Sequence, residues 1–152
     1  MPLILPERTI FSRATIPAWE YNRAAISVSW PRSEAMRVID HVEQERELWR
    51  PGVLTRMRIS SATGAEHLCI FEQWCDPGCG APSHLHTVEE VLTVLAGRAE
   101  IWIDEERAVL TAGQSMIVPA GHRHGFRNTG KTVLHMEAIL AAPMFGPVTQ
   151  RE

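Results

Sequence analysis

The feature that most constrains this chain is the pair His84 and His86, which a single residue separates. Side chains two positions apart leave the same face of a β-strand, whereas on a helix they diverge. Two imidazoles on one face can meet a single ion, so the spacing favours a strand. Glu90 follows after a gap that suits a short turn. Such a turn would bring its carboxylate from the next strand to the same centre.

His124 is the fourth candidate member of this centre. The residues around it are typical of tight turns between short strands: Gly113, Pro119, Gly121 and Asn128. The sequence therefore indicates a site for one metal ion, with three imidazoles and one carboxylate on short strands.

The chain after residue 50 has the pattern of a β-protein. Residues 53–59 alternate between two faces, and residues 68–75 form a second β-rich run after a cluster of turn residues, which predicts a hairpin. Further runs of this kind occur at 88–95, 99–103, 108–110, 115–118, 125–128 and 133–140. Short strands at close spacing predict a sandwich or a closed barrel, which leaves few exposed sheet edges.

The first third of the chain has a mixed pattern. Residues 23–30 are typical of a strand. Residues 34–48 are charged enough for a surface helix, but their apolar positions also fit an edge strand. Because the start of the chain is more apolar than a free tail, we expect residues 1–45 to be an extension that packs on the main domain or on a second subunit.

Length and composition exclude several classes of protein. A chain of 152 residues suits a single domain with a substantial core. Its 15 basic and 18 acidic residues give a net charge of −3 with the signs interspersed, which argues against a nucleic-acid partner. The sequence shows neither a secretory signal nor a membrane-spanning run, so we expect a cytoplasmic protein. Three cysteines form an odd set, which favours free thiols.

The candidate ligands match both signature motifs of the cupin superfamily, whose small β-barrels bind a divalent metal through three histidines and a glutamate. The first motif reads Gly78, five residues, His84, one residue, His86, three residues, Glu90, six residues, Gly97; the second reads Gly113, five residues, Pro119, one residue, Gly121, two residues, His124, three residues, Asn128. No position is missing, and the resemblance extends over approximately residues 50–142.

The resemblance implies an all-β fold, a double-stranded β-helix or jelly-roll barrel. We expect the barrel to comprise residues 46–142 and a C-terminal tail to comprise residues 143–152. The resemblance also implies that one divalent metal ion per chain is bound by His84, His86, Glu90 and His124. Cupins commonly pair their barrels, so we expect a homodimer whose other partner is a small-molecule substrate or ligand, with neither nucleic acid nor membrane involved.

The ligand set suits Fe, Mn or Ni, with Zn or Co as alternatives, rather than calcium. A six-coordinate ion with four protein ligands keeps two positions for substrate, water or dioxygen. For a cupin this implies a metal-dependent enzyme acting on an oxygen-rich or carboxylated small molecule. A dioxygenase or other oxidoreductase comes first, and an isomerase, cyclase or lyase next. A non-catalytic metal-binding or ligand-binding protein is the alternative, since no general base is evident. The chain also resembles small cupins of polyketide biosynthesis, without a motif that selects them.

Alternation along the predicted strands indicates what surrounds the centre. If Glu90 faces the metal ion, Leu92 and Val94 share its face, and Phe126 shares the side of His124. The pocket is therefore expected to be partly apolar.

Three further residues, His135, Glu137 and Arg56, are candidate catalytic residues. His135 and Glu137 share one face of a strand whose other face is uniformly apolar and is predicted to be core. They would face either solvent or the cavity, and only in the cavity would they serve as acid-base or ligand-orienting groups. Arg56 lies on the same side as Arg58, where it would either bind a substrate carboxylate or pair with surface acids.

Overall fold

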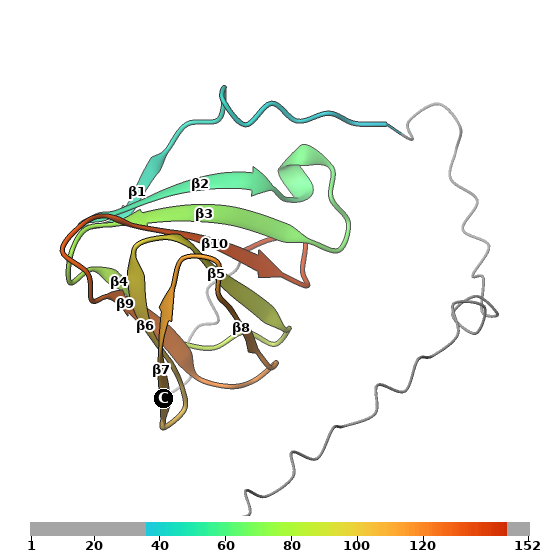
Figure 1. Ribbon diagram of the computed structural model, residues 1–152. Coiled ribbons are helices and arrows are strands. Elements are labelled where there is room, and N and C mark those ends of the chain that lie inside the picture. Colours follow the sequence, from blue (N-terminus) through green and yellow to red (C-terminus); the bar gives the residue numbers. More distant parts are fainter. Residues whose placement is uncertain (1–35, 146–152) are drawn as a thin grey trace, which may run out of the picture. The chain divides into compact units, whose positions relative to one another are not determined.

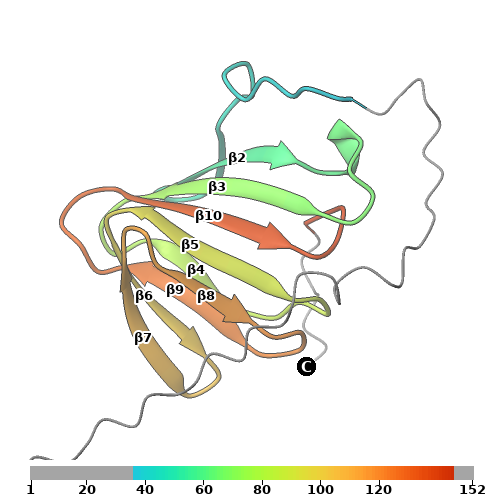
Figure 2. The ribbon, with the colours of Figure 1, turned by 45° about the vertical axis from the view of Figure 1, so that its right-hand side comes forward.

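The computed structural model describes residues 36–145, shown in colour in Figure 1. The predicted strand at 23–30 and most of the predicted extension lie outside these residues. The compact unit that begins at Val38 contains ten strands arranged in two antiparallel sheets. Figure 2 shows the two sheets as separate layers. This arrangement confirms the expected all-β jelly roll.

One sheet has six strands in the order β1-β2-β3-β10-β5-β8. Its members are β1 (Glu47–Arg50), β2 (Val53–Ile59), β3 (Cys69–Cys75), β10 (Leu134–Leu140), β5 (Glu90–Ala96) and β8 (Ser115–Val118). The other sheet has four strands in the order β4-β9-β6-β7. Its members are β4 (Gly80–His84), β9 (His124–Asn128), β6 (Arg98–Ile103) and β7 (Glu106–Thr111).

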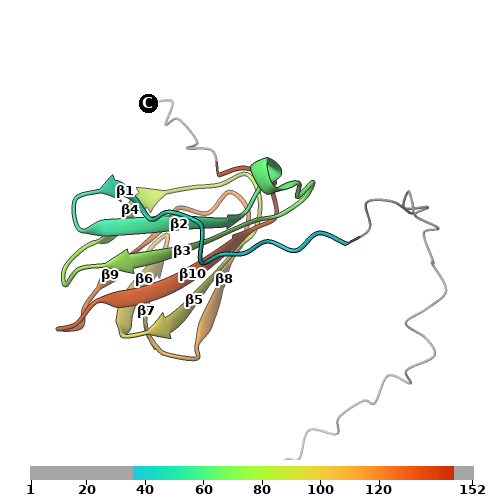
Figure 3. The same cartoon turned by 90° about the horizontal axis from the view of Figure 1, so that it is seen from above.

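Strand β10 shows how the sequence separates the two faces of the larger sheet. It pairs with β3 on one side and β5 on the other, and the three strands lie side by side in Figure 3. Every second residue is buried between the sheets, from Leu134 to Leu140, while His135 and Glu137 lie on the outer face. Full burial of one such apolar side chain contributes about 2 kcal/mol to stability, so this alternation fixes the strand's orientation.

The hairpin of β2 and β3 is confirmed, with a short 3-10 turn at Ser61–Thr63 in its connection. Two details differ from the sequence expectations. The helical alternative for residues 34–48 is wrong for the described part, where the chain runs through bends into β1. His84 is the last residue of β4, so His86 lies just beyond the strand. No helix within residues 36–145 is long and apolar enough to cross a membrane.

Candidate metal centre

The four predicted ligands lie together between the two sheets. His84 ends β4 and His124 begins β9, and these two residues are direct partners in the antiparallel pairing. Glu90 begins β5 in the opposite sheet, and His86 lies in the connection from β4 to β5. One ligand atom from each residue lies within 4.8 Å of all the others. Short strands thus bring distant parts of the chain to one point.

The spacing and the chemistry of these atoms fit a divalent ion. Donors about 2.1 Å from one ion lie at most about 4.2 Å apart, so small side-chain movements would close the 4.8 Å span around it. The Nε2 atom of His86 is buried and is the one side-chain polar atom in the described region that is both buried and without a hydrogen-bond partner. A buried polar atom of this kind needs an explanation, and a metal ion would supply the missing partner.

Backbone carbonyls orient two of the imidazoles. The Nδ1 atom of His84 lies 2.8 Å from the Pro82 carbonyl oxygen, and the Nδ1 atom of His124 lies 3.0 Å from the His122 carbonyl oxygen. A ring that donates from Nδ1 turns Nε2 toward the centre, as metal-ligating histidines do. Burial lowers the pKa of both His84 and His86, which favours the neutral imidazole that a metal requires.

Glu90 and His124 form a tight buried pair. Glu90 is 2% exposed, and its Oε2 accepts a hydrogen bond of 2.6 Å from Nε2 of His124. Burial opposes the charged form of His124, but the hydrogen bonds to Glu90 and to the His122 carbonyl, together with the nearby negative charges, outweigh it and raise the pKa of His124. A metal ion at this point would replace the shared proton, because its ligands must be deprotonated.

The centre opens into a cavity of about 180 Å³ between the sheets. Most of its lining is apolar and comes from both sheets and the chain after β10: Phe71, Ala81, Pro82, Leu92, Phe126, Met136, Ala138 and Phe145. The expected partly apolar pocket is confirmed, with Leu92 and Phe126 in its wall as alternation indicated. Val94 is not part of the lining and lies in the core.

Several lining residues were not identified as such from the sequence, among them Arg50, Gln73 and Phe145. The ring of Phe145 lies 5.1 Å from that of Phe71 and 5.5 Å from that of His86. No periodicity marks Phe145, because it follows the last strand. Gln73 is buried on the same face of β3 as Phe71. A polar residue at an inward position of the predicted strand is a signal that could have identified Gln73 as a cavity residue.

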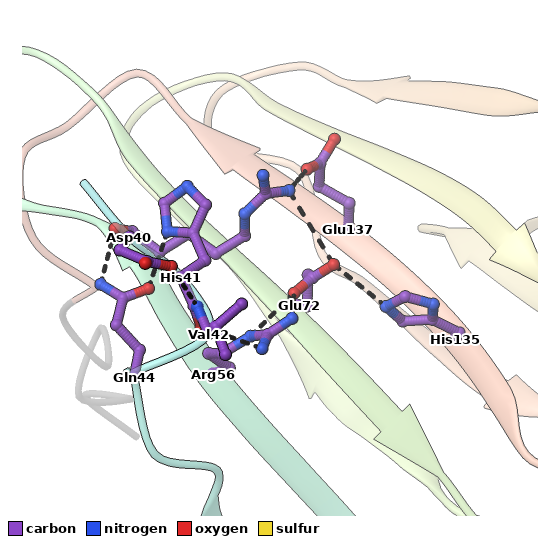
Figure 4. A network of polar contacts seen from close by, with 9 residues as sticks. Asp40, His41, Val42, Gln44, Arg56, Glu72, His135 and Glu137 are labelled. Carbon is purple, nitrogen blue, oxygen red and sulfur yellow. Dashed lines mark hydrogen bonds and ion pairs between the residues drawn. The ribbon is translucent and has the colours of Figure 1, made fainter. Parts of the chain in front are cut away.

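His135, Glu137 and Arg56 do not line the cavity. They lie on the outer face of the larger sheet, and Figure 4 shows them around Glu72. The structure therefore corrects the expectation that they serve the metal centre. Alternation along β10 turns Met136 and Ala138 to the cavity and turns His135 and Glu137 away from it. The apolar face of this strand is therefore both core and cavity wall.

We call these outer residues the outer-face network: Arg56, Arg58, Glu72, His135 and Glu137. Arg56 Nη2 lies 2.7 Å from Glu72 Oε2, and Arg58 Nη1 lies 2.7 Å from Glu137 Oε2. His135 Nε2 is 3.2 Å from Glu72 Oε1. Burial would raise the pKa of Glu72, but its hydrogen bond with Arg56 and the nearby positive charges outweigh this and lower the pKa. For Arg56, pairing with acids is the alternative that the structure confirms.

Comparisons with known proteins agree with this fold and site. A cupin-domain family model matches residues 73–140. Polyketide synthase CurC of Streptomyces cyaneus is 32% identical over 121 residues, which cover 74% of this chain and 76% of that protein. The polyketide cyclase RemF of Streptomyces resistomycificus superposes with a TM-score of 0.63 at 20% identity, over 77% of this chain and 88% of that chain.

A further structural neighbour is Bacillus subtilis oxalate decarboxylase, a protein with Mn(II) centres. Its TM-score is 0.62 at 16% identity, and the match covers 76% of this chain and 33% of that chain. Structural likeness at such identities shows the fold alone. The sequence match to CurC runs through most of both chains and agrees with the family model, the jelly roll and the four convergent ligands. The chain therefore belongs to the cupin superfamily.

Proposed function

We propose that the protein is a metal-dependent enzyme that cyclises an apolar, oxygen-bearing small molecule of the polyketide type. The observation that carries this proposal is the position of the four ligand atoms, within 4.8 Å of one another in the wall of a mainly apolar cavity. The names of CurC and RemF, a polyketide synthase and a polyketide cyclase, favour this substrate class.

The chemistry follows from the donor set. His84, His86, Glu90 and His124 would hold a divalent ion, and the ion would supply Lewis-acid polarisation of substrate oxygens such as those of a β-diketone. The carbon between two carbonyl groups then loses a proton more readily, and it can form a bond to a carbonyl carbon elsewhere in the same molecule. The carbonyl oxygen leaves as water, so no oxidant is needed. The apolar walls suit the rings of such a molecule.

Dioxygenase chemistry is the second proposal. It is supported by the number of ligands, because four protein donors to a six-coordinate ion keep two positions for substrate and dioxygen. A dioxygenase requires oxygen and the cyclisation does not, so one experiment with and without oxygen distinguishes the two reactions.

The test is to load the full chain separately with Fe(II), Mn(II), Ni(II) and Zn(II) and to incubate it with an aromatic poly-β-ketone, with and without oxygen. Cyclisation predicts a product lighter by one water that also forms without oxygen. A dioxygenase predicts a heavier product and oxygen uptake. His86→Ala should abolish either reaction, and the control His67→Ala, at a side chain 90% exposed, should not. If the chain binds the poly-β-ketone saturably but forms no product with any of the metals, both enzymatic proposals are contradicted and the protein is a binding protein.

We also propose that the chain forms a homodimer, on the basis of the family resemblance. Light scattering of the full chain should give twice its mass of 17.1 kDa. A monomeric mass at working concentration would contradict this.

A further inference from the structure

Arg50 differs from the other residues of the cavity wall. It is the one arginine or lysine among the described lining residues, it is half-buried, and no carboxylate within residues 36–145 forms an ion pair with it. On the outer face of the sheet, Arg56 and Arg58 each have a carboxylate oxygen at 2.7 Å. Partly buried arginines outside the cavity thus have carboxylate partners, whereas the arginine in the cavity wall has none within the described residues.

The backbone holds Arg50 at this position. The residue ends β1, and the following turn carries Gly52 at a φ of 70°. A Cβ atom on Gly52 would lie 2.5 Å from Sγ of Cys79, so glycine lets the turn pack closely beside the start of β4. Nη1 of Arg50 donates a hydrogen bond of 3.1 Å to the Gly80 carbonyl oxygen in that strand. The side chain is therefore anchored at one nitrogen.

A guanidinium has five N–H donors in a planar fork that matches a carboxylate. The hydrogen bond to Gly80 uses one of the five, and no other hydrogen bond from this side chain occurs within the described residues. A partly buried charge without a counterion is costly, and an anion that enters the cavity would offset that cost. The position of Arg50 in the wall allows such an anion to remain in the same cavity as the metal ligands.

The charge of the whole cavity points the same way. Glu90 is the one carboxylate among the described lining residues. A divalent ion together with Arg50 would exceed this single negative charge, and the apolar walls would strengthen attraction to an anion. The wall thus combines two positive centres with an apolar surface.

We propose that Arg50 is the anion-binding residue of the cavity and that the substrate carries a carboxylate in addition to an apolar body and oxygens for the metal ion. This proposal rests on the proposed function, since it names the substrate class of the same site. It assigns the side chain a binding role that is independent of which reaction follows.

The test is calorimetric titration of the full chain with naphthalene-2-carboxylate and, as the matched neutral probe, naphthalene-2-carboxamide. The protein is used metal-loaded and again after metal removal. The wild type should prefer the acid by roughly tenfold or more in both forms, as expected for a charge-assisted hydrogen bond. Arg50→Gln should lose this preference and keep its affinity for the amide, which reports an intact cavity. Arg50→Lys keeps the charge without the fork and should retain part of the preference.

Arg107→Gln is the matched control, because it removes the same charge at a side chain 61% exposed and outside the cavity. It should bind the acid as the wild type does. The proposal is overturned if the wild type binds acid and amide equally, if both glutamine variants lose the preference equally, or if Arg50→Gln keeps it in the metal-loaded form. The titration measures binding and not turnover, so a failure of the poly-β-ketone experiment would refute the proposed function without affecting the role of Arg50.

Discussion

The polar groups on the outer face of the six-stranded sheet differ from two polar groups in the cavity wall in whether they have partners. On the outer face, the acids and bases of the outer-face network satisfy one another over β2, β3 and β10. In the cavity wall, and counting residues 36–145 alone, His86 Nε2 has no hydrogen-bond partner and Arg50 has no ion pair with an acid. Buried polar groups are normally paired, so the unpaired ones mark where a ligand belongs.

Polarity alone therefore does not identify the functional face. Glu72 is 6% exposed and is surrounded by charged side chains, yet every charge in this group has a neighbour of opposite sign. Such a network contributes to folding, whereas the cavity retains binding capacity at the expense of stability. Removing residues from each face should accordingly affect different measurements.

The largest effect expected is loss of metal affinity in His86→Ala. Removing one of four protein donors should weaken binding of Mn(II) or Zn(II) by at least about 100-fold, more than loss of an outer-shell partner of a ligand. Titration calorimetry measures this. His135→Ala is the matched control on the outer face and should bind metal as the wild type does. Equal losses in the two variants would remove the distinction between the faces.

Glu72→Gln should lower the free energy of unfolding by about 2 kcal/mol, since it weakens hydrogen bonds to charged groups and leaves Arg56 without its acid. Metal affinity should not change. Urea unfolding of the metal-free protein measures the stability. Glu100→Gln is the control, because its contacts to Arg107 and Arg127 are 3.8 and 3.6 Å long and more exposed, and its loss should stay within about 0.5 kcal/mol.

The contribution of Glu72 should also depend on pH. Its pKa in the folded protein is lowered, below an unfolded value of about 4.3. A group of this kind contributes stability that is fully present above the unfolded pKa and is lost as pH falls through the folded pKa. The stability difference between wild type and Glu72→Gln should therefore be constant near neutral pH and shrink below about pH 4. A difference that stays constant down to pH 3 would contradict the role of its charge.

Among the variants of the outer-face network, the smaller effect on stability is expected for Arg58→Gln. Its side chain is 30% exposed and its pair with Glu137 lies at the edge of the network. The loss should be about 0.5 to 1 kcal/mol and should decrease in 1 M salt, because salt screens exposed charges. Unfolding in low and high salt measures it. A larger loss of stability that does not depend on salt would contradict the assignment of this pair as solvent-exposed and weak.

The sequence was sufficient for the centre and most of the strands. The spacing of His84, His86 and Glu90 and the second motif with His124 identified residues that the structure brings within 4.8 Å. Alternation also gave both faces of β10 correctly. Alternation did not show that the apolar face of β10 lines the cavity. The core of a barrel and its ligand cavity occupy the same interior, so an apolar inward face fits either one.

Arg50 and Phe145 were not predicted as cavity residues because tertiary contacts, and not local sequence patterns, place them in the wall. Arg50 lies in a four-residue edge strand with no inward alternation, and its side chain reaches the wall through a turn and a hydrogen bond to Gly80. Phe145 follows the last strand and reaches the cavity by packing on Trp49 and Phe71. Neither contact has a local pattern in the sequence.

The most direct test of the account is elemental analysis of full-length protein prepared without an affinity tag, beside a His84→Ala/His86→Ala variant. The account predicts close to one equivalent of a divalent transition metal per wild-type chain and almost none in the variant. If the wild type holds no metal even after anaerobic reconstitution, or if the variant retains as much as the wild type, the four residues do not form a metal centre.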